Sequence, residues 1–206
     1  MYGRVVRSGG KLVLQYWYFY YDDFYSYTPT VSDFIWQAHE GDWEVVNVVL
    51  SGDEQPLYVG YSQHCLGERR TWTDTTRWGS NHPVVYVARG SHANYLDQGV
   101  HAWNRACLPT DVIAFFNAAG LPLPNDYTSD AAAAGPASLD EEVTGIRRVT
   151  ATTPTWMQFP GTWGELQYLH APAPVGTIAS GFSPVGPAQH AVWGDPLGTL
   201  ATWPAS

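Results

Sequence analysis

The segment at residues 39–44 (HEGDWE) gathers most of the side chains in this sequence that could do chemistry. It leads into an apolar run at 45–50, which is typical of a β-strand. Because side chains alternate along a strand, Asp42 and Glu44 should share one face and Trp43 the other. Two adjacent carboxylates repel each other unless a proton or a cation lies between them. The segment therefore predicts a divalent-cation site, or else a turn that Asp42 caps beside a solvated Glu44.

Further ligands for such a site lie nearby. His39 comes just before the two carboxylates, in a predicted turn, and Asp22-Asp23 ends the preceding strand-like run, where a hairpin would bring it to the same rim. Oxygen-rich sites with one or two imidazoles are typical of Mg²⁺, Ca²⁺ or Mn²⁺. His64 and His92 each follow a strand-like run as lone histidines, which are more often hydrogen-bonded structural residues. Three histidines could also hold Zn²⁺, but no His-x-His or His-x3-His pair joins two imidazoles, so a hard cation is favoured.

Other chemistries find little support. The sequence has no Gly-x-Ser-x-Gly nucleophile motif and no Gly-rich phosphate loop. Cys65 adjoins His64, but neighbours along a strand point to opposite faces, which argues against a Cys–His pair. The chain carries 10 Lys and Arg against 19 Asp and Glu, a formal net charge of −9. It therefore lacks the basic surface that a general nucleic-acid-binding protein needs.

The elements that must position these residues are mainly strands. A helix is predicted from Thr110 or Asp111 to Gly120, and residues 121–142, rich in Pro, Ala, Asp and Ser, are predicted to form a surface excursion. The strand-like runs lie at 12–21, 43–50, 57–63, 83–88 and 143–150. This pattern predicts one domain over residues 1–206, a mainly β, antiparallel β-sandwich with short peripheral helices and long ordered coil.

Targeting and redox signals are sparse. No run of about 18 apolar residues predicts a membrane-spanning helix. The first residues do not form a signal peptide, because the apolar stretch after the two arginines is aromatic and has no small-residue cleavage site. Cys65 and Cys107 are too few for a disulfide scaffold, and the sequence leaves open whether they form one bridge or two thiols.

Several separated motifs resemble one family in order along nearly the whole chain. They are LQYWYFY at 14–20, HEGDWE at 39–44, YSQH at 61–64, PVVYVARGSHANY at 83–95, FPGTWG at 159–164 and SPVGP at 183–187. In these motifs the chain resembles the vacuolar protein sorting-associated protein 62-like family. The activity of that family is poorly defined, so the resemblance implies a fold more than a function.

A more distant resemblance is to the necrosis- and ethylene-inducing-like proteins, secreted cytolysins with a β-sandwich fold. WYF at 17–19, the DWE at 42–44 after a histidine, and His92-Ala93 match that family's strand, heptapeptide and later histidine. The resemblance implies that one divalent cation is surrounded, partly through waters, by Asp22, His39, Asp42, Glu44 and His92. It weakly favours an extracellular location. Glu40-Gly41 replaces the Arg-His of the heptapeptide, so metal binding is better supported than toxin activity.

Two functions agree with these observations. The first is a recognition module that binds a small-molecule, glycan or lipid-headgroup ligand at an acidic, aromatic-rich rim through Mg²⁺ or Ca²⁺, with Mn²⁺ or Zn²⁺ less favoured. Expected ligand contacts are His64, Tyr20, Trp43 and Tyr95. The alternative is a metal-dependent hydrolase in which the cation activates water and Glu44 or His92 is the general base.

Overall fold

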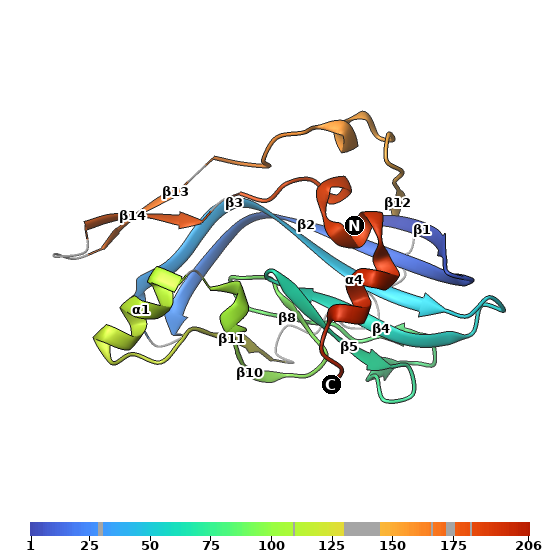
Figure 1. Ribbon diagram of the computed structural model, residues 1–206, viewed down its shortest axis with the longest axis horizontal. Helices are drawn as coiled ribbons and strands as arrows, with labels where there is room; N and C mark the ends of the chain where they lie inside the picture. The colour runs from blue at the N-terminus through green and yellow to red at the C-terminus, as the bar shows by residue number, and fades with distance from the viewer. Residues whose placement is uncertain (29–30, 109, 130–144, 166, 172–175, 182) are drawn as a thin grey trace.

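A mixed six-stranded sheet is the centre of the fold (Figure 1). The computed structural model describes residues 1–28, 31–108, 110–129, 145–165, 167–171, 176–181 and 183–206. The sheet has the strand order β12-β1-β2-β3-β4-β5, antiparallel except that β12 pairs parallel to β1. The strands are β1 (Tyr2–Ser8), β2 (Lys11–Thr28), β3 (Val31–Leu50), β4 (Pro56–Gln63), β5 (Leu66–Thr71) and β12 (Arg147–Arg148).

Four two-stranded hairpins and short helices surround this sheet. The hairpins are β6 (Arg77–Trp78) with β7 (His82–Pro83), β8 (Tyr86–Val87) with β9 (Asn94–Tyr95), β10 (Gly99–Ala102) with β11 (Asn125–Thr128), and β13 (Gln167–Ala171) with β14 (Gly176–Gly181). The α-helices described are α1 (Thr110–Ala119), α3 (Ala191–Gly194) and α4 (Pro196–Thr202). Short 3-10 helices are η1 (Arg105–Cys107), η3 (Thr155–Gln158) and η4 (Pro187–Gln189).

The mainly β fold and its short peripheral helices, including the helix at 110–119, are confirmed. Two packed sheets of a sandwich are not shown among the described strands, and the main sheet is mixed. The predicted strand at 83–88 is divided between β7 and β8. Of the predicted strand at 143–150, residues 143–144 lie outside the described residues, and within 145–150 the extended residues are 147–148. The predicted turn at 39–42 is wrong, because those residues continue β3. Within the predicted excursion, residues 125–128 instead form β11, and 130–144 lie outside the described residues.

Both faces of the sheet are covered, because β2 and β3 carry apolar side chains on both sides. One face packs against the C-terminal quarter of the chain, which starts above the sheet in Figure 1 and runs down through α4 to the C-terminus at the bottom of the view. This contact joins Trp17, Trp43 and Val45 to Met157, Val192 and Trp193, and joins Val49 to Leu200 and Trp203. The other face packs Val46, Val48 and Tyr61 against Leu96, Trp72 and Val85. The buried residues 41–49 of β3 therefore lie between two layers.

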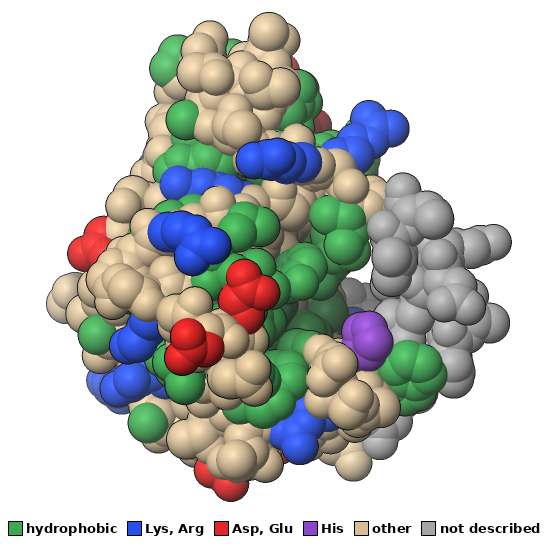
Figure 2. Space-filling model, turned by 90° about the vertical axis from the view of Figure 1, so that its right-hand side faces the viewer, with side chains coloured by type: hydrophobic (Ala, Val, Ile, Leu, Met, Phe, Trp, Pro, Cys, Tyr) green, Lys and Arg blue, Asp and Glu red, His purple; other side chains and the backbone are tan. Residues whose placement is uncertain are grey.

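Charged and apolar side chains are interspersed on one end of the molecule. Figure 2 shows the end of the molecule at the right of Figure 1, where Lys and Arg side chains are scattered and do not form a single patch. Hydrophobic side chains line a hollow near the middle of this face. No helix among the described residues is long and apolar enough to cross a membrane.

A buried polar network fastens the C-terminal helices to the sheet. The Gln15 side chain, fully buried in β2, donates from Nε2 to Asn47 Oδ1 and to the Val192 carbonyl, both at 2.9 Å. Its Oε1 accepts a hydrogen bond from Arg4 at 3.0 Å, and the Arg4 guanidinium lies 3.8 Å from the ring centroid of Trp193. The network satisfies groups that would otherwise be buried without partners.

We expect Gln15→Leu to lower the free energy of unfolding by about 2 kcal/mol, because it leaves buried acceptors without a donor. Urea unfolding with an unchanged m-value measures this loss. The matched control is Gln55→Leu, since Gln55 is exposed, and it should change stability by less than about 0.5 kcal/mol. Equal losses in the two variants would contradict a structural role for the network.

Candidate functional site

The pairing of β2 with β3 brings the predicted site residues together. Tyr18 lies opposite Glu44, Tyr20 opposite Asp42, and Asp23 opposite His39. His92, from the loop between β8 and β9, reaches Asp42 with Nδ1 3.2 Å from Oδ2. We call Asp23, His39, Asp42, Glu44 and His92 the Asp–His cluster. The structure thus unites four of the five predicted ligands and replaces the fifth.

That replacement is Asp23 for Asp22. Asp22 is exposed and pairs across the sheet with Glu40, whereas Asp23 is only 4% exposed. On the facing strand, Gly41 has a φ of +67°, which interrupts the extended backbone. His39 and Asp42 are three positions apart, so regular alternation would place them on opposite faces. The irregularity lets both reach the side where Asp23 lies.

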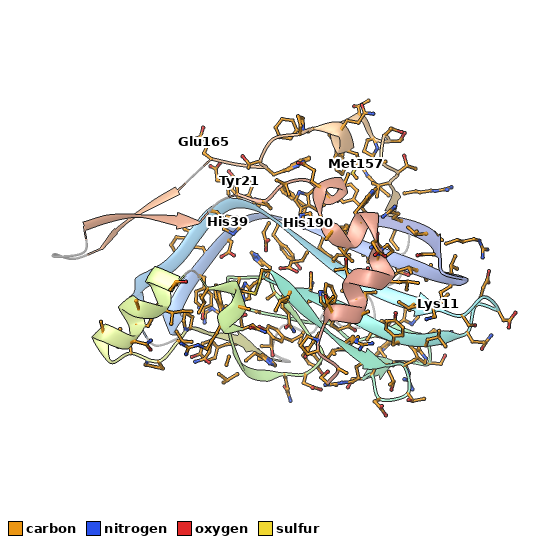
Figure 3. The ribbon with its side chains drawn as sticks, in the orientation of Figure 1. Lys11, Tyr21, His39, Met157, Glu165 and His190 are labelled. Carbon is orange, nitrogen blue, oxygen red and sulfur yellow. A yellow bond between two sulfur atoms is a disulfide. The ribbon has the colours of Figure 1, made fainter. Side chains whose placement is uncertain are left out.

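Only glycine fits at this irregularity. A Cβ on Gly41 would lie 2.2 Å from the carbonyl oxygen of Trp163. The backbone N–H of Glu165 in the same segment donates to the Glu40 carboxylate at 2.9 Å. Figure 3 shows His39 on the strand pair below the segment that carries Glu165. The C-terminal segment therefore holds the bend in β3 that shapes the cluster.

The His39 ring is set in one orientation. Its Nδ1 lies 2.7 Å from the Gly41 carbonyl oxygen, and since a carbonyl only accepts, Nδ1 carries the proton. Nε2 then faces Asp23 Oδ2 at 3.3 Å. Burial alone would lower the pKa of His39, but the Asp23 carboxylate raises it above its ordinary value. Burial likewise raises the pKa of Asp23, although its hydrogen bond to His39 partly offsets this effect.

Glu44 is the most enclosed carboxyl group of the cluster. It is 4% exposed, and its Oε2 accepts hydrogen bonds from the Ser62 hydroxyl and, at 3.4 Å, from Asn94. Burial raises the pKa of Glu44 well above its ordinary value, and the negative charge of Asp42 raises it further. Near neutral pH the site therefore favours a proton, or another positive charge, beside Glu44.

His92 is the cluster member that solvent can reach. Its side chain is 20% exposed and stacks on Tyr20, with ring centroids 4.0 Å apart and an interplanar angle of 4°. Its backbone has a φ of +56°, a left-handed conformation that costs a non-glycine residue about 1–2 kcal/mol. His64 has the same feature, with a φ of +52°. Both histidines contact a buried aspartate, so the surrounding structure holds them in strained positions.

A second polar centre surrounds Asp126 in β11. This side chain is fully buried and accepts hydrogen bonds from His64 at 2.7 Å, Ser91 at 2.5 Å and Tyr95 at 2.6 Å. Burial would raise the pKa of Asp126, but hydrogen bonds from His64, Ser91 and Tyr95 together lower it. Asp126 is therefore held as a carboxylate. It contributes to the raised pKa of Glu44, so the two centres sense each other's charge.

The predicted aromatic ligand contacts divide between several places. Tyr20 is in the cluster, and His64 and Tyr95 bind Asp126. Trp43 is buried on the opposite face of β3, where it stacks on Trp156. An open cavity of about 530 Å³ on that face is lined by Thr155, Trp156, Gln158, Phe159 and Trp163. It holds no ionisable side chain, so we place the candidate chemistry in the cluster.

The region that was predicted to be an aromatic rim is only partly exposed. Tyr21 is 82% and Phe24 55% exposed, whereas Tyr25 is buried against Trp103. Phe19 is 40% exposed and packs its ring against Trp43 and Trp163. Exposed aromatic rings therefore lie on the same strand as Tyr20 and Asp23.

The cluster is not a finished metal centre. Across the part of the chain that the structure describes, no three His, Cys, Asp or Glu side chains already form a group that could hold a metal ion. The contacts are instead pairwise, His39 with Asp23 and His92 with Asp42. One carboxylate oxygen, Asp23 Oδ1, is buried and has no hydrogen-bond partner among the described residues.

Comparison with known proteins finds two distant relatives. No family model matches the chain, and no solved structure matches it. Two curated proteins of Saccharomyces cerevisiae do match. Vacuolar protein sorting-associated protein TDA6 is 28% identical over 185 residues, and vacuolar protein sorting-associated protein 62 is 27% identical over 186 residues. The chain is a distant homologue of these Vps62-like proteins.

The match to the Vps62-like proteins covers 79% of this chain but 37% of each yeast protein. The resemblance drawn from the motifs is thereby confirmed, at a distance that indicates common descent and leaves function open. The more distant resemblance to the secreted cytolysins stays a prediction. The names of the two yeast proteins refer to vacuolar protein sorting and state no ligand or reaction.

Proposed function

We propose that the Asp–His cluster binds one divalent cation, Mg²⁺ or Ca²⁺, and that the bound cation helps to recognise an oxygen-rich ligand, a glycan or a lipid headgroup. The observation that carries this proposal is the geometry of His39. Its Nδ1 proton is engaged by the Gly41 carbonyl, while Nε2 faces a carboxylate oxygen of Asp23, where a cation could take the place of the Nε2 proton. This is the way in which a metal-binding histidine is oriented, since its other ring nitrogen usually donates to a carbonyl or carboxylate.

The contact between His39 and Asp23 also needs a positive charge. A nitrogen lone pair 3.3 Å from a carboxylate oxygen is repulsive unless a proton or a cation lies between them. The buried Asp23 Oδ1, without a partner among the described residues, is a further donor atom for a cation. Asp42 and Glu44 add two more carboxylates that share this electrostatic environment. Burial of three acids with so little positive charge favours a bound cation.

The donor set fits a hard cation better than a soft one. It would consist of carboxylates with one or two imidazoles, which suits Mg²⁺ or Ca²⁺ and, less well, Mn²⁺ or Zn²⁺. Binding would require Asp42 to exchange its contact with His92 for a contact with the cation. His92 and Tyr20 then lie at the solvent side, where exposed aromatic rings on β2 could stack on a sugar or contact a headgroup.

The sandwich also remains a proposal. The hairpin of β8 and β9 contacts β3 and β4 on the face that carries the cluster, and Val85 packs on the core of that face. We infer that this hairpin is part of a reduced second layer of a β-sandwich. In such an arrangement the cluster would lie at the edge between the layers, where loops can bring His92 to the strands.

A metal-dependent hydrolase is the second candidate function. The contact of His92 with Asp42 favours it, because a partly exposed histidine oriented by a carboxylate is suited to act as a general base. Glu44 is less suited to this role, since it is buried and its pKa is raised. Hydrolysis of a glycan or lipid probe that requires both the cation and His92 would favour the hydrolase over the binding module.

Titration calorimetry with Mg²⁺ and Ca²⁺ on chelator-treated protein tests the cation. We expect one site per chain and an affinity that Asp42→Asn lowers by at least tenfold. The matched control is Asp22→Asn, which removes the same charge from an exposed neighbour and should leave the affinity within about twofold. Failure of the wild-type protein to bind either cation, or equal losses in the two variants, would overturn the proposal.

A further inference from the structure

A small polar cavity lies beside the Asp126 centre, and no member of the Asp–His cluster lines it. Its volume is about 190 Å³. Its lining includes Gln63, His64, Glu68, Tyr95, Asn104 and Cys107. The Cys65–Cys107 disulfide joins the turn after β4 to η1, so one wall of the cavity is covalently closed. We call this cavity the Glu68 pocket.

The Glu68 pocket is negatively charged. Its lining contains no Lys or Arg, and Glu68 is its acidic side chain. One oxygen of Glu68 accepts the backbone N–H of Leu96 at 2.8 Å, which fixes the carboxylate and leaves its second oxygen for a ligand. Arg70, two residues further along β5, directs both terminal nitrogens at Asp97, at 2.9 and 2.5 Å. The nearby guanidinium is therefore neutralised by another carboxylate.

Asp126 lies behind the pocket and is paired with His64, so Glu68 carries the negative charge of the lining. His64 and Tyr95, which line the pocket, both direct their polar atoms at this fully buried carboxylate. The Tyr95 hydroxyl donates its proton to Asp126, so its oxygen can accept a hydrogen bond from a ligand. Gln63 donates from Nε2 to the Asn94 carbonyl, which leaves its Oε1 as an acceptor. The pocket thus combines a fixed carboxylate, neutral acceptors and two aromatic rings.

The size of the cavity limits the ligand. A volume of about 190 Å³ corresponds to about six water molecules at about 30 Å³ each. Cavities for nucleotides or drug-sized molecules are larger, about 300–1,000 Å³. A group of a few heavy atoms fits. A negative, acceptor-rich and aromatic surrounding favours a cation with N–H donors over an anion or a neutral alcohol.

We propose that the Glu68 pocket binds a primary ammonium group, of which ethanolamine is the simplest headgroup-sized example. Glu68 supplies the charge, Gln63 and Tyr95 accept hydrogen bonds, and the side chains of His64 and Tyr95 complete the lining. The same group occurs on free amines and on ethanolamine lipids. The inference does not depend on the divalent cation, because no member of the Asp–His cluster lines the pocket.

Titration calorimetry or ligand-observed NMR in the presence of chelator tests the pocket with ethanolamine, choline and glycerol. We expect ethanolamine to bind in the millimolar range or tighter. Choline, which has no N–H, and glycerol, which has no charge, should bind at least tenfold more weakly. Binding of glycerol or choline as tight as that of ethanolamine, or no binding of ethanolamine, would overturn the proposal.

Two variants with opposite expected effects guard against misfolding. Glu68→Gln keeps an acceptor for the Leu96 N–H and should weaken ethanolamine binding at least tenfold. Asn104→Asp keeps the oxygen that accepts the Ala106 N–H and adds a charge to the lining, so it should tighten binding several-fold. Asp53→Asn, at an exposed position away from the pocket, is the charge-matched control and should have no effect. Failure of both pocket variants to shift the affinity would contradict the proposal.

Vesicles distinguish the two sources of the amine. Cosedimentation with phosphatidylethanolamine vesicles that phosphatidylcholine vesicles do not reproduce, and that Glu68→Gln abolishes, would support a lipid source. Binding of free ethanolamine without vesicle binding would support a free amine. Asp42→Asn should leave all ethanolamine results unchanged, so failure of the cation site and failure of the Glu68 pocket can be told apart.

Discussion

Removal of the Cys65–Cys107 disulfide will lower the free energy of unfolding by about 4 kcal/mol. The bridge spans 42 residues of sequence. Closing a loop of that length removes conformational entropy from the unfolded chain, worth about 4 kcal/mol at 25 °C in the loop-closure description. For a chain of this size each kcal/mol shifts the melting temperature by about 2–4 °C, so the melt should move by about 10 °C.

Urea unfolding of Cys65→Ser/Cys107→Ser against the wild type measures this effect. Wild-type protein treated with a reductant should unfold like the double variant, and the reductant should not change the double variant. A loss below about 1 kcal/mol would mean that the segment between the bridged residues is already restricted in the unfolded chain. Because Cys107 lines the Glu68 pocket, the double variant should also bind ethanolamine more weakly.

The disulfide shows what the sequence alone could not decide. A sequence with two cysteines far apart is compatible with one disulfide or with two free thiols. The fold decides between them, because it brings the two Cα atoms to 5.4 Å. By contrast, the shared surroundings of Asp42 and Glu44 follow from local alternation in a regular strand, and the structure keeps both buried. Periodicity is reliable where the backbone is regular.

Side-chain periodicity fails as a guide where the backbone of a strand is irregular. Asp22 was favoured over Asp23 through the resemblance to the cytolysins, yet Asp23 is the buried residue of the two, and on the facing strand Gly41 has a positive φ and a tight contact with Trp163. The Glu40-Gly41 pair marked this place in the sequence. A glycine within an otherwise apolar strand signals a bulge or a close backbone approach. The sequence does not give the register of β2 against β3, so it could not show whether Asp22 or Asp23 joins the cluster.

Asp126 was missed for a different reason. It lies among Pro, Asn, Asp and Ser residues, a composition typical of exposed loops. Its burial depends on pairing β11 with β10 and on contacts with His64, Ser91 and Tyr95, which come from distant parts of the chain. Composition describes the average loop, whereas three hydrogen-bond donors can bury an aspartate in a particular one.

Acidification from pH 7.5 to 5.5 will weaken cation binding, while it stabilises the cation-free protein. In the absence of the cation, burial raises the pKa of Asp23 and of Glu44, and the Asp23 contact raises the pKa of His39. A cation that enters the cluster must displace protons from these groups. Each displaced proton makes the apparent affinity fall tenfold for every unit of pH below the pKa.

The stability of the cation-free protein should change in the opposite sense. A group whose pKa is raised on folding binds more protons in the folded state, so its stabilising contribution is complete below its ordinary pKa and is lost as pH rises through the folded value. All three groups have this sign. Asp97 and Asp126, whose pKa values are lowered, contribute the opposite slope only near and below about pH 4, close to the ordinary pKa of aspartate.

Titration calorimetry at pH 7.5, 6.5 and 5.5, together with thermal melts in chelator, tests both statements. Glu44→Gln keeps an acceptor for Ser62 but cannot ionise, so its chelated form should melt higher than the wild type at pH 7.5 and bind the cation at least tenfold more weakly. Asp53→Asn is again the charge-matched control. If the cation affinity were constant over this pH range, the cation would not bind at the Asp–His cluster. If the chelated protein lost stability on acidification, this result would contradict the raised pKa values of the buried Asp23 and Glu44.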